Sequence, residues 1–142
     1  NKKHLFYKMK ILFISGLNEK EGRLNDFMHD IVLHGLRELY GDSVIDYPGV
    51  WYMYGDEVKK RNYDINNLWG KGFTLYNLLS NYQQIDRTDI KKKIKTNYFD
   101  FIIFGSIHKS RSFLEETLNS KSKIVFVDGG DNPFINEQIT NY

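Results

Sequence analysis

Lys10-Ile-Leu-Phe-Ile-Ser-Gly-Leu17 is the stretch that best indicates the fold class of this 142-residue chain. Its apolar residues do not alternate with polar ones, and short runs of this kind are typical of strands covered on both faces, as in parallel sheets. Similar runs follow at Ser43–Tyr47, Phe99–Ile107 and Lys123–Asp128. We therefore expect an α/β fold, a Rossmann-like or flavodoxin-like three-layer domain with a mainly parallel sheet of about four strands.

Helical patterns lie between these runs. The predicted helices cover Leu24–Tyr40, a segment that begins at Asp86-Arg-Thr-Asp89, and Ser112–Asn119. The first has apolar residues at helical spacing and is followed by Gly41. The second begins with a sequence similar to a capping box and places Ile90, Ile94 and Tyr98 on one face. Strand–helix–strand units of this kind predict that the first strand lies between the second and the third.

The segment Gly49–Asp86 has no clear periodicity and is rich in aromatic residues. Because disordered segments are poor in aromatics, we expect an ordered excursion packed on the sheet edge or over its top, with a short helix at Phe73–Leu79. The aromatic residues either fill the core of a chain that has no alanine or present a stacking surface.

Composition limits the partners that the chain can have. The net charge of +2 gives no reason to expect nucleic acid, and the absence of cysteine excludes a thiol nucleophile. No segment is apolar enough to span a membrane, and we expect a cytoplasmic protein. We expect residues 1–8 to form an extension, 9–134 one domain, and 135–142 a tail.

Candidate site residues follow from the expected strand order. Ligands of open parallel sheets bind beyond the carboxyl ends of the strands, where the strand order reverses. The candidate ligand-binding residues in the loops there are Gly16, Asn18, Gly22, Ser106, Lys109, Asp128 and Asp131. The glycines either expose backbone N–H groups to an anion or only permit a tight turn.

His108, at the tip of the third strand, is the candidate catalytic residue. It could act as an acid or base, or bind a sugar hydroxyl or phosphate, and the alternative is an ordinary surface histidine. Asp128 and Asp131 flank two glycines and either hold a cation or ligand hydroxyls or form a turn, and we assign no metal site. His29 is expected to face solvent.

Several ligand classes lack their sequence signatures. The loop after the first strand has neither the G-x-G-x-x-G pattern nor a Walker lysine motif, so we expect no cofactor. No G-x-S-x-G elbow is present. The lysine run Lys91–Lys95 could bind phosphate, but a solvated helix face is the more common interpretation of such a run.

Five segments together carry a family resemblance: His34-Gly-Leu-Arg-Glu-Leu39, Val44-Ile-Asp-Tyr-Pro48, Gly70-Lys-Gly-Phe-Thr-Leu-Tyr76, Phe99-Asp-Phe-Ile-Ile-Phe-Gly-Ser106 and Val127-Asp-Gly-Gly-Asp131. The combination resembles the N-terminal domain of bacterial GT-B-type glycosyltransferase-like proteins of uncharacterised function. The resemblance covers most of Met9–Phe134. None of its motifs is a known catalytic signature.

The resemblance implies half of a two-domain enzyme. GT-B enzymes work in a cleft between two Rossmann-like domains, and the C-terminal one holds most of the nucleotide-sugar. This chain would then supply the acceptor side, incomplete for catalysis alone, with a second Rossmann-like domain and a nucleotide-sugar or sugar acceptor as partners. The alternatives are a non-catalytic module that binds a nucleotide or phosphorylated metabolite, and a protein-interaction domain.

Overall fold

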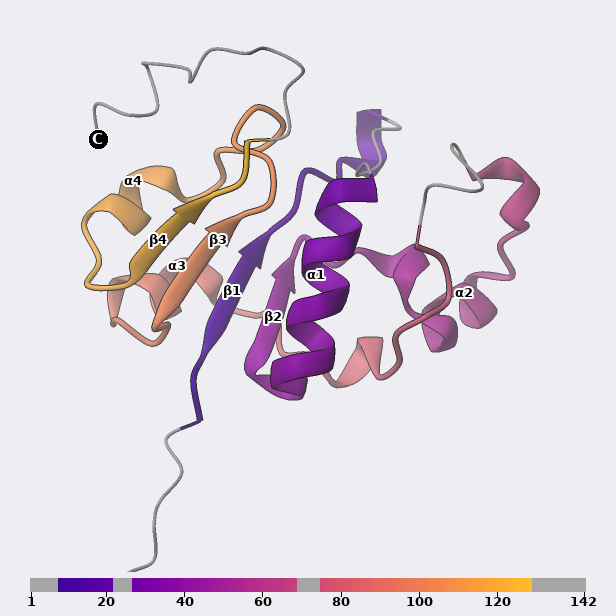
Figure 1. The fold of residues 1–142 in the computed structure, drawn as a ribbon, viewed down its shortest axis with the longest axis horizontal. Coiled ribbons are helices and arrows are strands. Elements are labelled where there is room, and N and C mark those ends of the chain that lie inside the picture. The colour runs from indigo at the N-terminus through magenta and orange to yellow at the C-terminus, as the bar shows by residue number, and fades with distance from the viewer. Residues whose placement is uncertain (1–7, 22–26, 69–74, 129–142) are drawn as a thin grey trace, which may run out of the picture.

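A parallel four-stranded sheet forms the centre of the computed structural model, which describes residues 8–21, 27–68 and 75–128 (Figure 1). The strands are β1 (Ile11–Ile14), β2 (Val44–Tyr47), β3 (Phe101–Phe104) and β4 (Lys123–Phe126). Their order is β2-β1-β3-β4, with Ile11 opposite both Val44 and Phe101. This confirms the expected position of the first strand.

Each strand is shorter than predicted. The hydrogen-bond ladder continues for one residue beyond β1 and β3, where Ser15 N donates to Tyr47 O at 2.8 Å and Gly105 N donates to Ile14 O at 2.9 Å. The chain then turns into the loops that follow the strands. The apolar runs are longer than the strands because some of their residues, such as Leu17 and Ile107, are buried in these loops.

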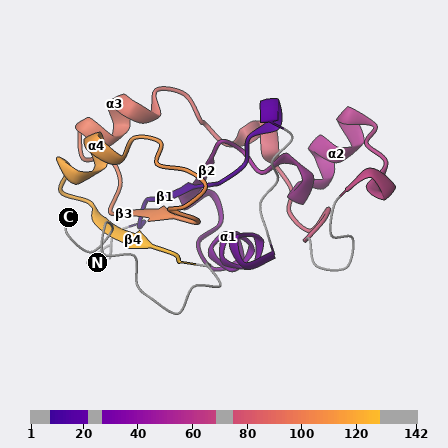
Figure 2. The ribbon, with the colours of Figure 1, turned by 90° about the horizontal axis from the view of Figure 1, so that it is seen from above.

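Helices cover both faces of the sheet, which confirms the three-layer fold (Figure 2). α1 (Phe27–Tyr40) lies on one face, and α3 (Ile90–Lys95) and α4 (Leu114–Leu118) lie on the other. Alternation along β1 divides the core: Ile11 and Phe13 belong to the cluster on the α1 side, and Leu12 and Ile14 to the cluster on the α3–α4 side.

The predicted capping box before α3 is wrong. Asp89, the residue before the helix, has a φ of 51° and makes no side-chain cap. Asp86 instead closes a local turn by accepting from Thr88 N at 3.0 Å, and it pairs with Lys93 Nζ at 2.7 Å. Tyr98 lies beyond the end of the helix and is 40% exposed, so it does not share the buried face of Ile90 and Ile94.

Residues 49–68 and 75–86 form a side lobe beyond the β2 edge of the sheet (Figure 1). Its elements are the 3₁₀ turns Trp51–Met53, Ile65–Asn67 and Tyr82–Gln84 and the helix α2 (Gly55–Arg61). Leu79 pairs with Tyr54 in a single bridge, and residues 75–79 are not helical. The ordered excursion is thus confirmed, while the helix predicted at Phe73–Leu79 is wrong over its described part.

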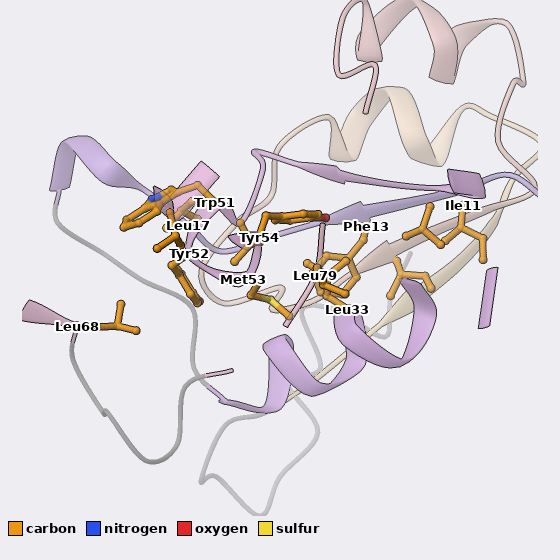
Figure 3. Packing of buried hydrophobic residues seen from close by; sticks show 14 residues of the cluster. Ile11, Phe13, Leu17, Leu33, Trp51, Tyr52, Met53, Tyr54, Leu68 and Leu79 are labelled. Atoms are coloured by element: carbon orange, nitrogen blue, oxygen red, sulfur yellow. The ribbon is translucent and has the colours of Figure 1, made fainter. Parts of the chain in front are cut away.

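Aromatic residues of the side lobe fill the core. Trp51, Tyr52 and Tyr54 are at most 5% exposed. They share one cluster with Phe13 of β1 and Leu33 of α1, beside Met53 and Leu79 (Figure 3). The structure therefore favours the core-filling interpretation for these three residues, which have no face available to stack on a sugar.

His29 is buried, contrary to the expectation that it faces solvent. It is 1% exposed near the start of α1, and its neighbour Asp30 accepts a 2.8 Å hydrogen bond from the hydroxyl of Tyr52. The side lobe packs against this end of α1, which buries a polar face that helical periodicity alone assigns to water.

Candidate functional site

A crevice of about 580 Å³ opens beyond the carboxyl ends of β1, β2 and β3, where the strand order reverses. Its walls come from three segments: residues 16–18 and Lys20 after β1, Tyr47 and Pro48 at the end of β2, and residues 109–112 after β3. The volume lies within the ordinary range for small-molecule sites, about 300–1,000 Å³. This position is the one that the strand order predicted.

Hydrogen bonds to the end of β2 fix the loop after β1. Ser15 Oγ donates to the carbonyl of Pro48 at 2.8 Å, and Leu17 is buried beneath the loop. Asn18 then begins a 3₁₀ turn, where its backbone oxygen accepts from Glu21 N at 3.2 Å. Gly16, Asn18 and Lys20 are thereby placed along the crevice.

The loop after β3 is a closed turn. The carbonyl of Ser106 accepts from Lys109 N at 3.1 Å and from Ser110 N at 3.0 Å. Ser110 Oγ in turn donates to Ser112 Oγ at 3.1 Å. These bonds place the cations at 109 and 111 and two hydroxyl groups on one wall of the crevice.

The charge of the crevice is one-sided. Lys20, Lys109 and Arg111 line it, and the described part of the chain places no Asp or Glu among its lining residues. Arg and Lys side chains bind phosphate oxygens strongly, Arg through paired N–H groups and Lys as a point charge. Ser, Asn and backbone groups supply additional hydrogen-bond partners. The arrangement suits a phosphate-bearing ligand.

His108 and Asp128 form a pair between the loops after β3 and β4. The distance from His108 Nε2 to Asp128 Oδ1 is 2.9 Å, and the two side chains are 40% and 41% exposed. When Nε2–H donates to the carboxylate, Nδ1 carries the lone pair and can accept a proton. Neither residue lines the crevice.

The structure separates the predicted site residues into groups. Gly16, Asn18 and Lys109 line the crevice, and His108 pairs with Asp128. Ser106 is 4% exposed and contributes its carbonyl to the turn rather than a side chain to the crevice. Gly22 and Asp131 lie outside the described residues.

Sequence reasoning missed several lining residues of the crevice, among them Lys20, Tyr47, Arg111 and Ser112. Arg111 and Ser112 follow a loop that had been noted, so a wider window after the third strand would have included them. Tyr47 was assigned only to its strand. Its position as the last residue of β2 was the signal, because that end of the strand borders the reversal of strand order.

The lysine run of α3 does not form a phosphate site. Lys91 pairs with Glu116 Oε1 at 2.5 Å and Lys93 with Asp86 at 2.7 Å. The remaining lysines of the run, Lys92 and Lys95, are exposed. The solvated helix face is the interpretation that the structure favours.

Among the described residues, no group of three or more His, Asp and Glu side chains is placed to share a metal ion. In the same part of the chain, no helix has the length and apolar character needed to cross a bilayer.

A second hollow, of about 450 Å³, lies at the amino ends of β3 and β4. It is lined by both Asp100 and the lysines at 121 and 123, so its charge is mixed. The amino edge of a parallel sheet is not where such folds bind ligands. We therefore take the crevice at the carboxyl edge as the candidate site.

Comparison with known proteins adds no relative: no family model, curated protein or solved structure shows significant similarity to this chain.

Proposed function

We propose that the crevice binds the phosphate groups of a small ligand, either a nucleotide or another phosphorylated metabolite. The observation that carries this proposal is that three cations, Lys20, Lys109 and Arg111, line the crevice together. A charge-assisted hydrogen bond contributes about 1.5–3 kcal/mol. Two or three such contacts to one phosphate group are enough for specific binding of a small anion.

A thermal-shift titration tests the proposal, with inorganic pyrophosphate as the first probe. A ligand at 100 times its dissociation constant stabilises the native state by about 2.7 kcal/mol. We expect pyrophosphate to raise the melting temperature, and the effect to weaken as ionic strength rises.

Charge-matched variants identify the site. The variant Lys109→Gln/Arg111→Gln should weaken pyrophosphate binding at least tenfold. The control Lys59→Gln/Lys92→Gln removes the same charge from exposed positions outside the crevice and should bind within about twofold of the unmodified protein. Equal affinity of the two double variants, or no stabilisation by pyrophosphate, would contradict the proposal.

The His108–Asp128 pair favours a second candidate function, the glycosyltransferase-like role that the sequence resemblance implies. Asp128 orients the imidazole of His108. In this role Nδ1 takes the proton of an acceptor hydroxyl while the hydroxyl oxygen attacks the anomeric carbon of the donor sugar. The bond from that carbon to the nucleoside diphosphate breaks, and the nucleoside diphosphate leaves. In that role a second domain holds most of the donor. Sugar transfer by the natural full-length protein should fall at least 100-fold in the variant His108→Ala, while its affinity for pyrophosphate stays the same. Undiminished transfer would show that His108 takes no part in the mechanism.

A further inference from the structure

One wall of the crevice is aromatic. Tyr47, the last residue of β2, lines the crevice, and its ring contacts that of Phe113 with centroids 5.2 Å apart and an angle of 53° between the planes. Both rings are half-buried against the cluster on the α3–α4 side of the sheet. The phosphate-binding proposal does not use this wall.

Phe113 is held in place at a conformational cost. Its φ is 61°, in the left-handed region that a bulky side chain rarely adopts. Such a conformation persists only where the surrounding structure enforces it. Here the closed turn of residues 106–110 precedes Phe113 and α4 follows it directly. Tyr47 therefore packs against an aromatic neighbour whose backbone conformation is set by these elements.

The end of β2 also differs from the other walls in polarity. Tyr47 and its neighbour Pro48 offer an aromatic ring and an apolar ring, whereas Lys109 and Arg111 on the loop after β3 offer charge. A nucleobase has two flat faces and needs a ring on which to stack.

We propose that the ligand of the crevice is a nucleotide, with its base stacked on Tyr47 and its phosphates on the cations of the neighbouring loops. The inference rests on the phosphate-binding function proposed above and specifies the ligand of the same site. A stacked base is expected to strengthen binding by roughly tenfold or more. The crevice volume of about 580 Å³ lies within the usual range for small-molecule sites.

Matched probes separate the base from the rest of the ligand. AMP and UMP are compared with ribose 5-phosphate, which carries the same sugar and phosphate without a base. We expect at least one nucleotide to bind roughly tenfold or more tightly than ribose 5-phosphate. Tyr47→Leu should remove this difference and leave the affinity for inorganic pyrophosphate within about twofold, whereas Tyr47→Phe should keep it.

The outcomes distinguish failure of the inference from failure of the proposed function. If pyrophosphate binds and depends on Lys109 and Arg111, but neither nucleotide exceeds ribose 5-phosphate, the nucleotide inference is wrong and phosphate binding stands. If ribose 5-phosphate itself loses affinity in Tyr47→Leu, Tyr47 contacts a sugar, which also overturns the inference. The affinity of Tyr47→Leu for pyrophosphate serves as the check that this variant is folded.

Discussion

Asp46 is a buried carboxylate with no exposed side-chain surface, and its contacts join the sheet to the side lobe. Its Oδ2 accepts from Val50 N at 2.8 Å, and its Oδ1 accepts from Arg87 Nη2 at 2.7 Å. Arg87 also donates to the carbonyls of Asp46 and Tyr82, at 2.9 and 2.8 Å. The Asp46–Arg87 pair thus connects β2 with both ends of the lobe.

Loss of Arg87 should therefore cost far more than loss of a surface cation. Arg87→Met leaves the Asp46 carboxylate buried and unpaired, and we expect the free energy of unfolding to fall by about 3–5 kcal/mol. Urea denaturation measures this change. Lys91→Met, which removes an exposed lysine from its pair with Glu116, is the control and should change stability little.

The double variant Asp46→Asn/Arg87→Met keeps this prediction testable if Arg87→Met does not fold. Without a charge on either partner, it should recover part of the lost stability. A loss of less than about 1 kcal/mol in Arg87→Met would show that the Asp46–Arg87 pair stabilises the protein no more than a surface pair does, and would contradict the prediction.

The same cluster influences Tyr54. Burial raises the pKa of its hydroxyl well above the ordinary value, and the nearby Asp46 carboxylate raises it further, while Arg37 and Arg87 lower it. Tyr54 therefore stays neutral throughout the physiological range.

At the residue scale, the sequence predicted the site residues whose position follows directly from the ends of the strands. Gly16, Asn18 and Lys109 line the crevice because they follow strands, and strands were recognisable from their apolar runs. The burial of His29 was not predictable from helical spacing, because the side lobe that contacts the neighbouring Asp30 comes from a segment without periodicity. Arg87 was likewise missed, since its partner lies forty-one residues earlier in the chain.

At the scale of single elements, two glycines give opposite predictions for the same substitution. A Cβ at Gly105, just after β3, would lie 2.3 Å from Cζ of the buried Phe13 ring, whereas a Cβ at Gly35 within α1 would meet nothing within 4 Å. Gly105→Ala should lower the free energy of unfolding by about 1–3 kcal/mol through overpacking. Gly35→Ala should raise it by about 0.5–1 kcal/mol, because alanine favours the helix.

Chemical denaturation of the two variants checks both signs. Because each substitution restricts the unfolded chain to a similar extent, that contribution cancels in the difference between the variants. If Gly105→Ala were as stable as Gly35→Ala, the Phe13 ring would have room to move away from residue 105. The predicted overpacking of Phe13 against this position would then be wrong.

Element prediction succeeded where burial follows a regular period and failed in the side lobe. α1 and the four strands were recognised, whereas α2 was missed and a helix was placed at residues 73–79. Apart from α2, the described part of the lobe is built from short 3₁₀ turns and one bridge, Tyr54–Leu79, which leave no repeating pattern of apolar residues. Its core comes from consecutive residues, Val50–Tyr54, all of them buried.

For the whole molecule, the cluster on the α1 side implies one cooperative unit. It contains Phe13 of β1, Leu33 of α1 and Tyr52 of the side lobe, so the lobe cannot lose its packing without exposing the sheet. The fluorescence of Trp51, which is buried in the lobe, reports on the packing of the lobe. Far-UV circular dichroism reports mainly on the helices, of which α1 is the longest among the described residues.

We therefore expect the two signals to give the same unfolding midpoint. The variant Trp69→Phe leaves Trp51 as the only tryptophan and should give that midpoint as well. A fluorescence transition at lower denaturant concentration than the dichroism transition would show that the side lobe unfolds separately.

The position of β1 between β2 and β3 has a consequence for synthesis on the ribosome. β2 can pair with β1 soon after it emerges, but Ile11 meets Phe101 only after ninety further residues have been added. At about 5–20 residues per second, this takes roughly 5–18 s. During that interval one edge of β1, and the apolar side chains that β3 and its helices later cover, are open to other nascent chains. We expect this protein to need chaperone protection while it is being translated.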